Sequence, residues 1–255
     1  MNPDLKAALA AQLLIMADDE LILGHRDSEW CGHAPILEED IAFANIALDE
    51  IGHAVTWYGL LADLKGEDRE NYPNRLVYHR DLSDFRCVQM VEHPKGDWAF
   101  SMLRQYLFDS YEKVRLDWLV NSSYTPVAEA AAKMRPEEVY HLRHTRAWVR
   151  RLGLGTEESN RRMQAALDQL WPYALQLFAA LPDDALLVDA GYFPHSDALC
   201  ESWQAVVIAY LQDVHLDVPH TSNPIAITRA EHSVDLNLLL NNLQEVARSY
   251  PDAGW

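Results

Sequence analysis

Two Glu-x-x-His motifs, at residues 50–53 and 138–141, restrict the fold of this 255-residue sequence more than any other feature. On an α-helix, residues three positions apart lie on one face, so each motif places a carboxylate beside an imidazole. The positions that extend these two faces are apolar: Ile46, Trp57, Met134 and Trp148. A carboxylate buried among apolar side chains is costly unless a cation compensates it. One such motif would be weak evidence, but two in apolar surroundings suggest a metal site.

The rest of the chain indicates helices, because no run of alternating β-branched residues predicts a strand. Clusters of Gly, Pro, Asn and Ser separate the helical segments. We expect helices at about 4–27, 37–65, 97–122, 126–152, 157–181, 196–216 and 232–248. Pro136 lies inside the fourth of these, where a proline removes a backbone hydrogen bond, so we expect a local irregularity there.

The lengths of the first two predicted hairpins place four acidic residues at matching heights. The first turn is centred near Ala34, and Glu20 and Glu50 lie almost equally far from it on either side. The second turn is centred near Tyr124, and Asp109 and Glu138 flank it in the same way. Nearly equal arms bring each pair of carboxylates together on antiparallel helices, so the same register occurs twice.

Motifs and hairpins together predict one ligand set from four helices: Glu20, Glu50, His53, Asp109, Glu138 and His141. This is the pattern of a di-iron centre in a ferritin-like four-helix bundle, in which one long crossover joins the two hairpins. Hard carboxylates and imidazole nitrogens suit iron without the softness of thiolate. We therefore predict an all-α fold in a single domain, residues 1–255. Its bundle core should span about 4–152, and additional C-terminal helices should span about 156–250.

Other readings of the six residues remain open. Glu50 and Glu138 could lie on a solvated helix face, and the two histidines could be hydrogen-bonded core residues. Asp109 reaches one methylene less than Glu, so it could hold a metal off-centre or not at all.

Composition and charge exclude several classes of function. The net charge of −18 argues against nucleic acid as a partner, because neutralising phosphates needs a basic surface. No apolar run approaches the roughly 20 residues of a membrane span. The N-terminus does not look like a secretory signal, and the three cysteines form no Cys-x-x-Cys pair. We expect a cytoplasmic protein.

Other candidate sites are weaker. Cys31 and His33 lie at the first turn without further ligands, and we interpret them as helix-end packing. Six histidines share no spacing and are interpreted as surface or packing residues: His79, His93, His195, His215, His220 and His232. Four arginines follow the second motif, and we interpret them as a solvated face, with an anionic ligand or an acidic partner subunit as the alternatives: Arg143, Arg146, Arg150 and Arg151.

Several longer motifs resemble those of a known family, the C subunits of ring-1,2-phenylacetyl-CoA epoxidase, a bacterial multicomponent monooxygenase. They are Glu29-Trp-Cys-Gly-His-Ala-Pro35, Ala44-Asn-Ile-Ala-Leu-Asp49, Arg104-Gln-Tyr106 with Asp109, Tyr140-His-Leu-Arg143, Arg151-Leu-Gly153, Met163-Gln164, Leu170-Trp171 and the terminal Trp255. These motifs run essentially from end to end of the chain, and the first is quite specific.

The resemblance implies a complex that uses O₂ and electrons from NADPH, delivered by a separate reductase subunit, to epoxidise the ring of phenylacetyl-CoA in aerobic phenylacetate breakdown. In this family the catalytic di-iron centre belongs to the A subunit. The C subunit is a paralogous bundle that pairs with it, often with degraded metal ligands. Here only Asp109 departs from the usual Glu. We expect a subunit that stabilises an A-type partner while it retains its own ligand set.

If this chain binds iron, we expect Glu50 and Glu138 to bridge the two ions. His53 and His141 would be terminal ligands, with Glu20 and Asp109 as terminal carboxylates. The alternative is that the chain is itself an active di-iron oxygenase or oxidase; a ferroxidase is less favoured. Self-association stays open.

Overall fold

The computed structural model describes residues 1–179, 181–220, 228–251 and 253. This part of the chain contains ten α-helices and no strand, which confirms the prediction of an all-α fold. None of the described helices is both long enough and apolar enough to cross a membrane. Trp255, one of the residues that carries the family resemblance, lies outside the described residues.

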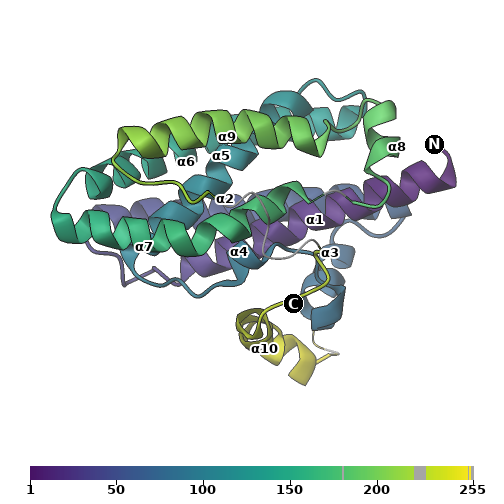
Figure 1. The fold of residues 1–255 in the computed structure, drawn as a ribbon. Helices are drawn as coiled ribbons and strands as arrows, with labels where there is room; N and C mark the ends of the chain where they lie inside the picture. Colours follow the sequence, from purple (N-terminus) through teal and green to yellow (C-terminus); the bar gives the residue numbers. More distant parts are fainter. Residues whose placement is uncertain (180, 221–227, 252, 254–255) are drawn as a thin grey trace.

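Two antiparallel helical hairpins form the core of the molecule (Figure 1). The first consists of α1 (Pro3–Ser28) and α2 (Leu37–Lys65), and the second of α5 (Trp98–Leu119) and α6 (Thr125–Gly153). These bounds agree with the predicted ones to within three residues. The α6 helix continues through Pro136, whose side chain is exposed.

The crossover between the hairpins is more structured than the sequence suggested. It contains two short helices that were not predicted, α3 (Asn71–Tyr78) and α4 (Gln89–Glu92). Between them lies a single 3₁₀ turn, Leu82–Asp84. The α4 segment packs against α1 and α7, so the crossover is part of the core.

The C-terminal third, where the structure describes it, adds four further helices to the two hairpins and the crossover. Its helices are α7 (Glu157–Ala174), α8 (Asp184–Asp189), α9 (Ser196–Asp213) and α10 (Val234–Ser249). Both α7 and α9 pack along α5, whereas α10 packs against α3 to one side of the bundle (Figure 1). The helix predicted for 157–181 is shorter than expected, because it tightens into a 3₁₀ turn at Leu175–Phe178.

Capping residues fix where the bundle helices begin and end, and therefore the lengths of the hairpin arms. The side chain of Asn2 accepts a hydrogen bond from the Leu5 amide at 2.7 Å. Asp97 does the same for the amide of Phe100 at 2.9 Å, which starts α5. Gly66 ends α2 with a φ of 75°, a left-handed conformation that favours glycine.

Gly24 allows α1 and α2 to approach each other closely, one turn from Glu20. A Cβ atom at this position would lie 3.0 Å from the carbonyl oxygen of Ala47 and 3.0 Å from the Cβ of Glu50. Such distances are shorter than ordinary packing contacts, so any larger residue must push the helices apart. The missing side chain at Gly24 thus lets α1 and α2 pack closely beside Glu50.

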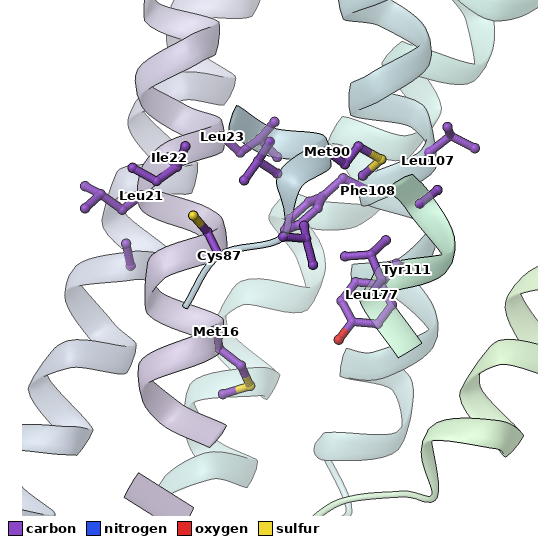
Figure 2. Close-up of a cluster of buried hydrophobic side chains, with 14 of the residues drawn as sticks. Met16, Leu21, Ile22, Leu23, Cys87, Met90, Leu107, Phe108, Tyr111 and Leu177 are labelled. Atoms are coloured by element: carbon purple, nitrogen blue, oxygen red, sulfur yellow. The ribbon is translucent and has the colours of Figure 1, made fainter. Parts of the chain in front are cut away.

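The apolar core runs through both hairpins and the crossover. Figure 2 shows part of it, with Met16 and Leu21 of α1, Met90 of α4 and Phe108 of α5 among the buried side chains of one cluster. Three tryptophans are completely buried, Trp57, Trp171 and Trp203, and the last two stack with ring centroids 5.2 Å apart. This dense packing holds the helices in one register.

Two glycine substitutions test whether the close approach at Gly24 controls stability. Gly52 lies in α2 with open space around its Cβ position, so Gly52→Ala should stabilise the protein by about 0.5–1 kcal/mol through helix propensity. Gly24→Ala gains the same propensity but loses about 1–3 kcal/mol to overpacking. Denaturant unfolding of both variants measures the difference directly. Equal stabilities would show that α1 and α2 separate at no cost.

Candidate metal centre

Five of the six predicted ligands meet in the middle of the bundle. Glu20, Glu50 and His53 form one group, and Glu50, Glu138 and His141 form another. Within each group, the atoms that could bind a metal lie within 4.8 Å of one another. All five side chains are buried, and Glu50 belongs to both groups. This placement follows from the matched hairpin arms, because α1, α2 and α6 each bring their ligands to the same height.

Both histidines direct Nδ1 towards the carboxylates. Nδ1 of His53 lies 3.7 Å from Glu20 Oε2 and 3.6 Å from Glu138 Oε1. Nδ1 of His141 lies 3.2 Å from Glu138 Oε1 and 3.6 Å from Glu50 Oε1. The two rings are 6.2 Å apart between centroids. Glu138 therefore contacts both histidines and lies between the two groups.

Two acidic residues that sequence reasoning missed hold the other nitrogen of each histidine. Nε2 of His53 is 2.8 Å from Glu137 Oε2, and Nε2 of His141 is 3.1 Å from Asp49 Oδ2. The pairs cross between hairpins, since the acid directly before the Glu of one motif bonds the histidine of the other. An Nε2–H donated to a carboxylate fixes the ring and leaves Nδ1 available to a metal. Both residues could have been found in the sequence, because each is an acid directly before the Glu of a Glu-x-x-His motif.

The sixth predicted ligand, Asp109, is buried nearby, but both its oxygens are already engaged. Oδ1 accepts a hydrogen bond from Gln105 Nε2 at 2.8 Å, and Oδ2 accepts one from Thr145 Oγ1 at 2.7 Å. The same amide of Gln105 also donates to Glu50 Oε1 at 2.7 Å. The structure thus does not group Asp109 with the other five, and a metal would have to displace these donors to reach it.

A buried ion pair borders the cluster on the side of α1. Glu112 lies one turn after Asp109 on the same helix, is fully buried, and contacts the guanidinium of Arg115. Nη2 of Arg115 also lies 3.5 Å from Glu20 Oε1. Sequence reasoning missed both residues, although the spacing of three from Asp109 placed Glu112 on the same face. Arg115 supplies a permanent positive charge beside the predicted ligands.

The protonation of the cluster reflects burial together with its internal hydrogen bonds. Burial alone would raise the pKa of Glu20, but hydrogen bonding with Glu50 and with His53 lowers this pKa to about 2. Burial and the charge of Glu20 raise the pKa of Glu50 well above its ordinary value. Burial would lower the histidine pKa values, yet the neighbouring carboxylates raise them to about 9 for His53 and about 11 for His141. A metal that binds here must therefore release protons.

Unsatisfied polar atoms show that the residues fit a metal ion. Both oxygens of Glu20, Oε2 of Glu50 and Oε2 of Glu138 meet no amide or hydroxyl donor, so only protons shared among the acids and histidines of the cluster can satisfy them. Buried lone pairs without a donor are costly, and they converge on the same small region. Carboxylate oxygens and imidazole nitrogens are suitable ligands for iron. The donor set and its grouping are compatible with a carboxylate–histidine metal site.

Replacing the crossing carboxylates tests their role in positioning the histidines. We expect Asp49→Asn or Glu137→Gln to weaken metal binding by about 10–100-fold, because the histidine ring loses its anionic partner. Glu129→Gln, on the exposed surface of α6, is the control and should change nothing. Titration of the metal-free protein with Fe(II) under anaerobic conditions measures the affinity. Unchanged affinity in both variants would contradict a positioning role.

The comparisons with known proteins agree with this architecture. A family model described as phenylacetic acid catabolic protein matches residues 1–255. The chain is 35% identical over 248 residues to the C subunit of 1,2-phenylacetyl-CoA epoxidase from Escherichia coli (strain K12), covering 97% of this chain and 99% of that protein. It is 25% identical over 180 residues to the A subunit of the same enzyme and organism, covering 71% of this chain and 57% of that protein. The chain belongs to the phenylacetic acid catabolic protein family.

Proposed function

We propose that this chain is a subunit of a multicomponent phenylacetyl-CoA ring epoxidase, in which it pairs with and stabilises an A-type catalytic subunit. The observation that carries the proposal is the similarity to the epoxidase C subunit, which extends along nearly the full length of both chains. The weaker similarity to the A subunit supports a paralogous bundle as the partner. Electrons would come from NADPH through a separate reductase subunit.

We further propose that the chain retains its own di-iron site. The ligands would be Glu20, Glu50, His53, Glu138 and His141, with Asp109 joining if Gln105 and Thr145 release it. Bound iron would supply the chemistry of oxygen activation. The chain itself would orient the histidines through Asp49 and Glu137, exclude water, and give up the protons held on the imidazoles and on Glu50.

Exposed apolar side chains on α2 and α6 support a partner interface on this side of the bundle. Leu48 and Val55 on α2 are 66% and 57% exposed, and Val139 and Tyr140 on α6 are 47% and 43% exposed. Leu48 and Val55 are one heptad apart, a spacing that suits packing against another helix. Large apolar side chains gathered on neighbouring helices are typical of an interface.

A pair of surface substitutions tests this interface. Leu48→Glu with Val55→Glu should reduce co-purification with the A-type partner by about tenfold or more, since two buried charges oppose association. Val206→Glu on α9, where the side chain is 54% exposed, is the matched control and should leave pairing intact. Pairing by the double variant would place the interface elsewhere. Failure of the unaltered chain to pair would overturn the proposed function.

The second candidate function is that the chain itself is a di-iron oxygenase or oxidase. The unsatisfied lone pairs of Glu20, Glu50 and Glu138 favour it, because a purely structural bundle has no need of them. A ferroxidase is a weaker third candidate, since the family does not favour it.

Metal content and turnover separate these candidates. We expect about two irons per chain after anaerobic loading, and loss of iron in Glu50→Ala and His141→Ala. With reductase and NADPH but without the A-type partner, phenylacetyl-CoA should remain unchanged. Formation of epoxide under these conditions would favour the second candidate, and an iron-free chain that still pairs with the A-type partner would leave only the structural role.

A further inference from the structure

A second cluster of metal-ligand types lies outside the bundle centre, where the crossover meets the C-terminal segment. Cys87 lies just before α4, Glu92 is the last residue of α4, and His232 comes 140 residues after Glu92, just before α10. Cys87 and Glu92 are fully buried, and the His232 side chain is 2% exposed. Figure 2 shows Cys87 among the buried side chains of α1 and α4. The sequence analysis treated His232 as a surface or packing residue, and the buried cluster corrects the surface reading.

The three side chains present one possible ligand atom each, and these atoms lie within 4.8 Å of one another. Cys87 Sγ is 3.8 Å from Glu92 Oε1, and His232 Nδ1 is 2.7 Å from the same oxygen. The other oxygen of Glu92 accepts a hydrogen bond from the Ser233 amide at 2.7 Å. Glu92 Oε1 is thus shared by a sulfur and a nitrogen, the two most common ligand types for zinc.

The contact made by Nε2 of His232 shows which nitrogen of the ring carries the proton. Nε2 lies 2.9 Å from the carbonyl oxygen of Phe85, which only accepts hydrogen bonds, so Nε2 carries a proton. In the neutral ring, Nδ1 then presents a lone pair to a carboxylate oxygen. Two lone pairs at 2.7 Å repel unless a cation lies between them, and that cation is either a proton or a metal. A ring fixed by a backbone carbonyl is the usual arrangement for a metal-binding histidine.

The distance between the Cys87 sulfur and the Glu92 oxygen fits a shared metal ion. A Zn–S bond of about 2.3 Å and a Zn–O bond of about 2.0–2.2 Å place the two ligand atoms about 3.5–3.7 Å apart at a tetrahedral angle. The observed 3.8 Å is close to this value, and without a metal the Cys87 thiol donates a weak hydrogen bond to Glu92 at the same distance. The nitrogen–oxygen distance of 2.7 Å is shorter than the roughly 3.3 Å of a tetrahedral site. The His232 ring must therefore move by about half an ångström.

We propose that Cys87, Glu92 and His232 form a binding site for a zinc-like divalent cation, distinct from the carboxylate–histidine site in the bundle. One thiolate, one imidazole and one carboxylate are a ligand set for zinc or cobalt(II), with a fourth position left for water. The ion would join the crossover to the segment that leads into α10, two parts of the chain that are far apart in sequence. This site is independent of the proposed function, because no iron ligand takes part in it.

Cobalt(II) provides a specific probe, because thiolate ligation produces an intense charge-transfer absorption in the near ultraviolet. The predicted bundle ligands include no sulfur, so they cannot give this band. We expect it to appear when Co(II) is added to the full, reduced, metal-free chain at about pH 8, where the proton of the Cys87 thiol, whose pKa burial raises, is more readily displaced. Glu50→Ala, which disrupts the bundle site, should leave the band unchanged.

Two cysteine variants decide the assignment. Cys87→Ser should abolish the charge-transfer band and bind one metal ion fewer, and His232→Gln should lower the affinity by about tenfold or more. Cys200→Ser is the matched control, because Cys200 lies on α9, away from the cluster, and this variant should keep the band. Circular dichroism confirms that each variant is folded. Absence of the band from the unaltered chain, or its persistence in folded Cys87→Ser, would overturn the proposal and leave a proton between His232 and Glu92.

Discussion

Acid–histidine pairs that cross from α2 to α6 join the two hairpins at the level of the predicted metal ligands. Asp49 pairs with His141, and Glu137 pairs with His53. A third pair, Glu39 with His144 at 3.0 Å, lies nearer the start of α2. Because the pairs run antiparallel along both helices, any slip between hairpins breaks more than one of them. The alignment of the bundle and the orientation of the histidines therefore depend on the same contacts.

The buried acidic residues of the bundle centre are expected to lower the stability of the fold. Glu20, Glu50, Asp109, Glu112 and Glu138 are all buried within a few helical turns. The permanent counter-charge among these residues is the guanidinium of Arg115, which contacts Glu20 and Glu112. A bundle with apolar residues at these positions would be as stable or more so, because buried charges rarely recover their desolvation cost. Such a cluster is expected where a bound ligand needs the carboxylates.

The sequence predicted the features that depend on periodicity and arm length. The four bundle helices, and the meeting of Glu20 with Glu50, follow from apolar spacing and turn position, which are local properties. Asp49 and Glu137 could have been found from their places in the motifs. The occupation of Asp109 by Gln105 and Thr145 could not, because it depends on side-chain rotamers on two helices. The same holds for the cluster at His232, whose partners are about 140 residues away and share no motif with it.

The partial exposure of the two crossing carboxylates has a further consequence. Asp49 and Glu137 are 38% and 43% exposed at the surface of α2 and α6, while the histidines they hold are buried. A protein that covers this surface removes water from both carboxylates, and their hydrogen bonds to the histidines become stronger in the lower local dielectric. The basicity of His53 and His141 would change with it. A partner bound at the outer surface would thus change the metal affinity of His53 and His141 without any movement of a helix. Assembly would then adjust how firmly an ion is held.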